Sequence, residues 1–124
     1  METGIYQVKL LSEGLCTHEK LAQVEHPTQP MRFNDGRCDR QGRFFSGTML
    51  NDTKAGMRVG SFYRFNNDYQ LTRLWGDLIV PNGLAFSPDG ATMYLADTHP
   101  SRQTIWSFDY DTDTGTPHHQ RVFV

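Results

Sequence analysis

The sequence has few cysteines and little net charge, and both shortages exclude classes of function. Its two cysteines, Cys16 and Cys38, do not form a CxxC pair, so neither a zinc knuckle nor a redox dithiol is indicated. We expect two reduced and mostly buried thiols. Twelve basic and 14 acidic residues leave a net charge of −2, which offers no basic field for a nucleic acid. Nucleic acid is therefore not an expected partner.

Long apolar runs are also missing. No stretch approaches the roughly 18 apolar residues that a membrane-spanning helix needs. The first residues, METGIYQV, lack the basic and apolar regions of a signal peptide. From the sequence we therefore predict no membrane partner and a cytoplasmic location.

Helical patterning is weak throughout the chain. Glycine, proline, asparagine and aspartate interrupt it so often that no apolar stripe with helical spacing survives. Short alternating stretches instead predict β-strands, and turn sequences such as SPDG at 87–90 supply the glycine that a tight hairpin needs. The predicted strands cover residues 4–9, 21–24, 36–39, 43–48, 61–65, 70–75, 83–86, 92–96, 104–109 and 120–124.

Two segments share one pattern of residues: RFNDGRCDRQGRFFSGTM at 32–49 and PNGLAFSPDGATMYLADT at 81–98. Aligning Asn34 with Asn82 also aligns Gly42 with Gly90, which gives a repeat of 48 residues. Repeats of about 40 to 50 residues, each containing four short strands, are typical of a β-propeller, because one blade cannot bury both of its faces alone. The sequence therefore predicts an all-β propeller built from four-stranded antiparallel blades.

The motifs RFNDG, GRFFSGTM, PNGLAFSPDG and YLADT together resemble those of the senescence marker protein, gluconolactonase and luciferin-regenerating enzyme family, which includes regucalcin. This resemblance covers essentially the whole chain. It implies a six-bladed propeller with a divalent metal at the top of its central channel, and many members hydrolyse sugar lactones. At about 40 to 50 residues a blade, the chain covers about two to three blades, approximately 1–31, 32–80 and 81–124. It is similar to the middle of the family's sequence, so the family's metal-binding glutamate and aspartate are expected before Met1 and after Val124.

The same resemblance implies roles for five residues. Asn82 matches the family's metal-binding asparagine, and its amide oxygen suits a calcium, zinc or manganese ion. Arg32 and Asn34 match positions that contact the substrate, and their side chains can hydrogen-bond the oxygens of a sugar lactone. Asp52 falls where the family often has a longer glutamate that reaches the substrate. Asp97 is expected to support the channel wall without touching a ligand.

The residues taken alone also permit simpler interpretations. Asn34 and Asn82 lie in sequences that are ordinary turns, and Arg32 can be a solvated edge residue. Asp52 can be a loop carboxylate that points into water. Asp97 can be a strand-end aspartate that accepts hydrogen bonds from turn amides.

The remaining chemistry-bearing residues predict no catalytic group within this chain. Strand alternation predicts that the adjacent His118 and His119 face opposite sides and cannot bind one metal together. No GxSxG elbow is present, and neither cysteine has a recognisable base beside it in the sequence.

Two functional hypotheses of different classes remain open. In the first, the chain is part of a sugar-lactone hydrolase that opens aldonolactones with one divalent ion as cofactor. The chain alone would then have little activity, because one asparagine cannot hold the ion. In the second, it is a catalytically inactive partial propeller that acts as an interaction module or self-associates through exposed blade edges.

Overall fold

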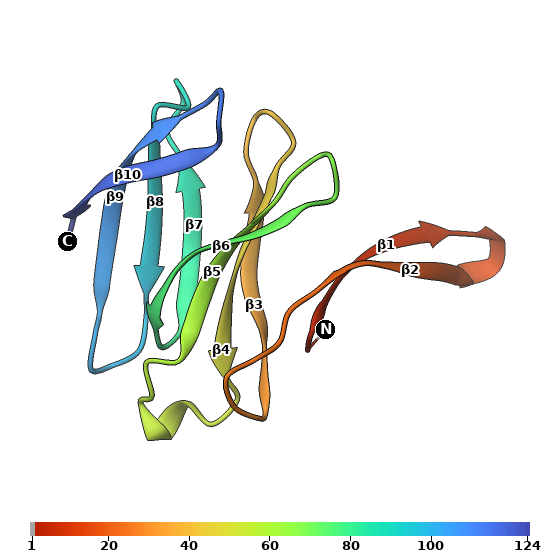
Figure 1. Cartoon of the computed structure of the whole chain (residues 1–124), viewed down its shortest axis with the longest axis horizontal. Coiled ribbons are helices and arrows are strands. Elements are labelled where there is room, and N and C mark those ends of the chain that lie inside the picture. Colours follow the sequence, from red (N-terminus) through yellow and green to blue (C-terminus); the bar gives the residue numbers. More distant parts are fainter. Residues whose placement is uncertain (1) are drawn as a thin grey trace.

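The computed structural model describes residues 2–124, which form ten β-strands and two short 3-10 turns (Figure 1). The elements in chain order are β1 (Gly4–Leu10), η1 (Ser12–Gly14), β2 (Cys16–Gln23), β3 (Met31–Cys38), β4 (Phe44–Leu50), η2 (Thr53–Ala55), β5 (Gly60–Phe65), β6 (Leu71–Leu78), β7 (Pro81–Phe86), β8 (Thr92–Asp97), β9 (Thr104–Asp111) and β10 (Thr116–Val122).

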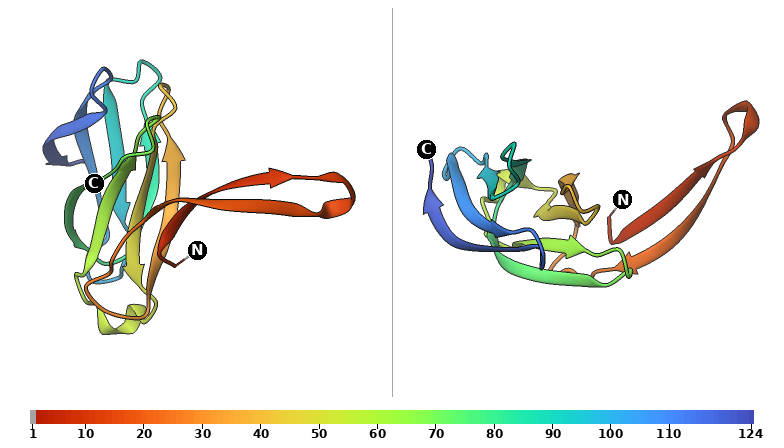
Figure 2. Two further views of the ribbon diagram at one scale, coloured as in Figure 1. Left: turned by 45° about the vertical axis from the view of Figure 1, so that its right-hand side comes forward. Right: turned by 90° about the horizontal axis from the view of Figure 1, so that it is seen from above.

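The strands form two four-stranded antiparallel sheets and one hairpin. Strands β3 to β6 make the first sheet and β7 to β10 the second, each in the order of the sequence. Within the described part of the chain, strands β1 and β2 pair only with each other, and their hairpin projects away from both sheets (Figures 1 and 2). The all-β prediction with four-stranded antiparallel sheets is confirmed. The division of the chain into blade segments 1–31, 32–80 and 81–124 stays a prediction.

Two sequences that we interpreted as possible turns are β-bulges inside strands. Between Phe33 and Gly36, β3 has one residue more than the segment of β4 that it pairs with. Between Asn82 and Ala85, β7 likewise has one residue more than its partner segment of β8. An extra residue bends the strand and redirects its side chains. For this reason β3 begins at Met31 and β7 at Pro81, five and two residues before the predicted strand starts at 36 and 83. The outer strands β2 and β10 also begin earlier than predicted.

The core lies between the two sheets. Buried aromatic and aliphatic side chains from both sheets form one cluster, which consists of Phe45, Phe62, Leu78, Leu84, Met93, Leu95, Trp106, Phe108 and Tyr110. Aromatic contacts cross between the sheets, with ring centroids 6.0 Å apart for Phe45 and Tyr110 and 5.1 Å apart for Trp75 and Phe108. At Gly47 on β4, a Cβ would overlap the ring of Pro81 on β7, so the glycine permits the close approach of the sheets.

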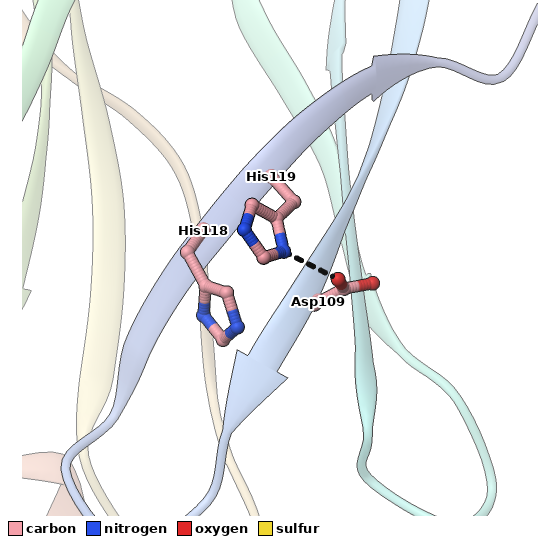
Figure 3. A group of neighbouring side chains, drawn as sticks. All are labelled: Asp109, His118 and His119. Carbon is pink, nitrogen blue, oxygen red and sulfur yellow. Dashed lines mark hydrogen bonds and ion pairs between the residues drawn. The ribbon is translucent and has the colours of Figure 1, made fainter.

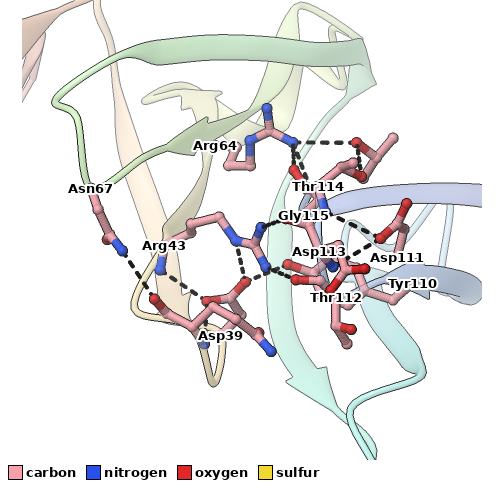
Figure 4. A network of polar contacts seen from close by, with 12 residues as sticks. Asp39, Arg43, Arg64, Asn67, Tyr110, Asp111, Thr112, Asp113, Thr114 and Gly115 are labelled. Atoms are coloured by element: carbon pink, nitrogen blue, oxygen red, sulfur yellow. Dashed lines mark hydrogen bonds and ion pairs between the residues drawn. The ribbon is translucent and has the colours of Figure 1, made fainter.

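A buried carboxylate joins the two sheets beside this core (Figure 4). The Asp39 carboxylate accepts hydrogen bonds from the Arg43 Nε at 2.6 Å and from the Tyr110 hydroxyl at 2.5 Å. Asp39 follows β3, whereas Tyr110 lies on β9 of the other sheet. Burial alone would raise the pKa of Asp39, but the hydrogen bonds from Tyr110 and Arg43 outweigh it and lower the pKa below its usual value. The carboxylate is therefore held in its charged form.

Two arginines extend this junction to the turn between β9 and β10. Arg43 donates to the carbonyls of Asp113 and Thr112, and Arg64 donates to the carbonyls of Thr114 and Gly115 (Figure 4). Gly115 has a φ of +68°, and a Cβ there would lie 2.7 Å from the Arg43 guanidinium. We call Asp39, Arg43 and Tyr110, with these turn contacts, the intersheet clamp.

The prediction of buried cysteines is wrong, because both thiols are exposed. Cys16 begins β2 in the projecting hairpin, which has no second layer to cover it, and Cys38 lies at the end of β3. Among residues 2–124, no helix is long and apolar enough to span a membrane.

Removing the Tyr110 hydroxyl tests the intersheet clamp. Tyr110→Phe keeps the ring that packs on Phe45 but leaves the Asp39 carboxylate without one of its donors. We expect a loss of about 1.5–3 kcal/mol in the free energy of unfolding, the range for hydrogen bonds to charged groups. Urea unfolding followed by tryptophan fluorescence measures it.

Tyr69→Phe is the matched control, because Tyr69 is exposed. Equal unfolding midpoints for Tyr110→Phe and Tyr69→Phe would show that the clamp contributes nothing measurable.

Candidate substrate and metal site

The candidate site lies where the first strands of the two sheets meet. β3 and β7 are each one of the two edge strands of their sheet, and both begin at the same end of the molecule (Figure 1). Arg32 and Asn34 lie near the start of β3, and Asn82 lies near the start of β7. The Asn34 Nδ2 donates to the Asn82 Oδ1 at 2.8 Å and to the Pro81 carbonyl at 2.9 Å. The structure therefore brings together these three residues that the sequence identified.

The hydrogen bonds of these residues have a fixed direction. An arginine can only donate, so the Arg32 Nη1 at 2.7 Å makes the Asn34 Oδ1 an acceptor and turns its Nδ2 toward Asn82. The Asn82 Nδ2 donates to the Thr98 Oγ1 at 2.8 Å, and the Thr98 hydroxyl donates to the Val80 carbonyl at 3.3 Å. We call Arg32, Asn34, Asn82 and Thr98 the polar relay. The amide orientations of Asn34 and Asn82 follow from the Arg32 donor at one end of the relay and the Val80 carbonyl acceptor at the other.

Thr98 was not singled out from the sequence. It follows the end of β8, and its role depends on β8 pairing with β7, which places it beside Asn82. Its only signal in the sequence was its place in the motif YLADT. In the structure it fixes which atom of the Asn82 amide is free to act as an acceptor.

Asp97 organises the backbone beneath the relay. Its side chain is fully buried, and its carboxylate accepts hydrogen bonds from the backbone N–H groups of Ile79, Val80 and His99 at 2.8, 2.9 and 3.3 Å. These are the turn amides that the simpler interpretation expected. Asp97 thereby holds the link between β6 and β7, and with it the start of the strand that carries Asn82.

Asp52 lies in the loop after β4 and makes no hydrogen bond to the polar relay within residues 2–124. Its carboxylate accepts from the Lys54 N–H at 3.1 Å and caps η2, and the side chain is exposed. The loop is nevertheless held near the site, because the Thr53 carbonyl accepts from the His99 Nε2 at 3.0 Å. The substrate role of Asp52 stays a prediction.

A divalent ion fits this site only in part. The Asn82 Oδ1 has a second lone pair beside the one that Asn34 uses, so it can supply one neutral oxygen ligand. The neighbouring carboxylate, Asp97, already accepts three backbone hydrogen bonds. Residues 2–124 thus place one ligand here without the carboxylates that a divalent ion needs for charge balance.

The family model described as "SMP-30/Gluconolactonase/LRE-like region" matches residues 1–124. The chain belongs to this family. The resemblance seen in the sequence motifs is confirmed.

Individual relatives match only over part of their own length. The chain is 35% identical over 124 residues to the 6-deoxy-6-sulfogluconolactonase of Pseudomonas putida, which covers all of this chain and 41% of that protein. A luciferin-regenerating enzyme structure superposes with a TM-score of 0.83 and 28% identity, over 98% of this chain and 40% of the other. A calcium-binding regucalcin from Agrobacterium tumefaciens gives a TM-score of 0.74 and 34% identity, over 90% and 36%. The fold class is thereby confirmed as part of a β-propeller of this family, and the chain spans about two fifths of these relatives.

Breaking the relay at its centre should also loosen the two sheets. Asn34→Ala removes both hydrogen bonds that the Asn34 side chain donates to β7 and leaves the Pro81 carbonyl and the Asn82 oxygen without that donor. We expect a loss of about 1–3 kcal/mol in the free energy of unfolding. Chemical unfolding measures it, with the exposed Asn51→Ala as control. A loss no larger than that of Asn51→Ala would contradict the relay.

Proposed function

We propose that this chain supplies part of the active site of a sugar lactonase, namely the groups that bind the lactone oxygens and one neutral ligand for a divalent ion. The observation that carries the proposal is the polar relay, which joins Arg32, Asn34 and Asn82 across two sheets in a fixed direction. The family and the names of its lactonase relatives support the reaction class.

The relay leaves suitable groups for a hydroxyl-rich ring. Both hydrogen bonds of Arg32 come from Nη1, to the Phe33 carbonyl and to Asn34, so within residues 2–124 its Nη2 and Nε bind no other group. These N–H groups can donate to the ring or carbonyl oxygen of an aldonolactone. The relay also fixes the Arg32 side chain before the substrate arrives, which reduces the entropy cost of binding.

Asn82 is the residue of this chain that would hold the ion, which we propose to be calcium, zinc or manganese. A bound divalent ion would polarise the lactone carbonyl. Thr98 and Asn34 orient the Asn82 amide so that its oxygen is available, as outer partners commonly do for metal ligands. Because the chain spans only part of its relatives and brings one ligand, we propose that it has little lactonase activity by itself.

The activity test uses a complete propeller. Residues 1–124 replace the matching segment of the Pseudomonas putida lactonase, and opening of a series of aldonolactones is followed by acid release in calcium, zinc or manganese. We expect metal-dependent opening of at least one lactone. In the same chimera, Asn82→Ala should lower kcat/KM by at least about tenfold, because even the loss of an outer partner of a metal ligand costs about 10- to 100-fold.

Asn51→Ala in the same chimera is the matched control, and each chimera is checked for folding by circular dichroism. A folded chimera without metal-dependent opening of any lactone would overturn the proposal, and so would an Asn82→Ala chimera with unchanged kcat/KM.

A second function is favoured by the projecting hairpin. Among the described residues 2–124, no other strand pairs with β1 or β2, and several large apolar side chains of this hairpin are exposed, including Leu10 at 81% and Leu15 just before β2 at 64%. Unpaired strand edges with apolar side chains recruit further strands. We therefore propose that the chain can also self-associate through this hairpin.

Light scattering across a range of concentrations tests this second function. We expect a mass above that of the monomer, and Leu10→Asp should return it toward the monomer because the charge opposes burial of the hairpin. Met57→Asp is the control, since Met57 is exposed outside the hairpin. A monomer at every concentration, or equal effects of both substitutions, would exclude the hairpin as the contact.

A further inference from the structure

Asp109 on β9 and His118 and His119 on β10 form a cluster on the second sheet (Figure 3). One possible ligand atom from each residue lies within 4.8 Å of the others. The prediction that the two histidines face opposite sides is wrong, because their possible ligand atoms lie together with that of Asp109. Between His118 and Arg121, β10 has one residue more than the segment of β9 that it pairs with, so β10 contains a bulge.

The bulge explains why both rings lie on one side. His119 has a φ of 51°, which is the left-handed region and breaks the alternation of an extended strand. The two imidazole centroids consequently lie 4.8 Å apart. His118 is also paired directly with Asp109 in the register of β9 and β10, so all three side chains gather at the bulge.

Hydrogen bonds to neighbouring groups orient His118 and Asp109 and leave one possible ligand atom on each. The His118 Nδ1 contacts the Thr116 carbonyl at 3.3 Å, and since a carbonyl only accepts, the Nδ1 carries the proton and the Nε2 keeps its lone pair. The Arg121 Nη2 holds the Asp109 Oδ1 at 2.6 Å, which leaves the Oδ2 for another partner. That Oδ2 lies 2.9 Å from the His119 Nδ1. A backbone carbonyl and an arginine thus take the places that outer partners occupy around bound metals.

We propose that Asp109, His118 and His119 form a surface site for a transition-metal ion, with zinc as the best-suited metal. Two imidazole nitrogens and one carboxylate oxygen are a ligand set found at open zinc sites, which keep a fourth position for water. Ligands of a tetrahedral zinc ion lie about 3.4 Å apart at bond lengths of about 2.1 Å, so small side-chain rotations close the cluster around an ion. The site is separate from the candidate lactone site and stands whether or not the lactonase proposal holds.

The exposure of the cluster permits metal entry. The side chains of His119 and Asp109 are 72% and 43% exposed, so an ion can reach them from solvent. Binding replaces the hydrogen bond between His119 and Asp109 by two bonds to the metal, with the neutral His119 ring carrying its proton on Nε2 so that the Nδ1 lone pair binds the ion. Arg121 remains paired with the other carboxylate oxygen and keeps it oriented.

A zinc titration of the 124-residue chain against a chromophoric zinc indicator tests the site. We expect one zinc ion per chain, with His118→Ala and His119→Ala each weakening binding by at least about tenfold, because even the loss of an outer partner costs about 10- to 100-fold. Calcium should not displace the zinc, since imidazole nitrogens are poor ligands for a hard ion.

Two variants serve as matched controls, and circular dichroism checks that every variant is folded. His18→Ala removes another exposed histidine, on β2, and Asn82→Ala removes the proposed ligand of the other site. Both should bind zinc as the unchanged chain does. The proposal is overturned if the chain does not compete with the indicator, if the His118 and His119 variants retain full affinity, or if His18→Ala weakens binding equally.

Discussion

The charged Asp39 carboxylate between the two sheets is the interaction on which the arrangement depends. It receives the Arg43 guanidinium from its own sheet and the Tyr110 hydroxyl from the other, while Arg43 and Arg64 hold the turn between β9 and β10 by its carbonyls. A buried charge without such donors would cost several kcal/mol. This cost favours the one separation and angle of the two sheets at which Arg43 and Tyr110 both reach the carboxylate. The same rigid placement lets Asn34 on one sheet reach Asn82 on the other.

Three β-bulges shape the chemistry of the chain. The bulges on β3 and β7 lie at the equivalent asparagines of the two repeats and let those side chains meet at the junction of the sheets. The bulge on β10 brings His118 and His119 to one side. A regular strand would place alternate side chains on opposite faces, so each proposed site depends on an interruption of the strand pattern. The backbone irregularities are therefore part of the functional geometry.

Part of the candidate site was predictable from the sequence and part was not. The 48-residue repeat correctly placed Asn34 and Asn82 at equivalent positions, and neighbouring repeats of a propeller lie side by side. Thr98 was missed because its contact with Asn82 depends on the pairing of β8 with β7. The exposed cysteines and the His118 and His119 cluster were predicted wrongly, since average burial and ideal alternation do not describe a projecting hairpin or a bulge.

The sequence by itself determined the all-β class, the repeat, the hairpin turns and the family, because these follow from local residue preferences and from motifs that need no knowledge of distant contacts. Only the tertiary structure decided which donors and acceptors pair between the sheets, the direction of the relay from Arg32 to Thr98, and the single side on which Asp109 and its two histidines meet. The physical reason is that hydrogen-bond direction and bulge position depend on register and sheet packing, which residues distant in the sequence fix together.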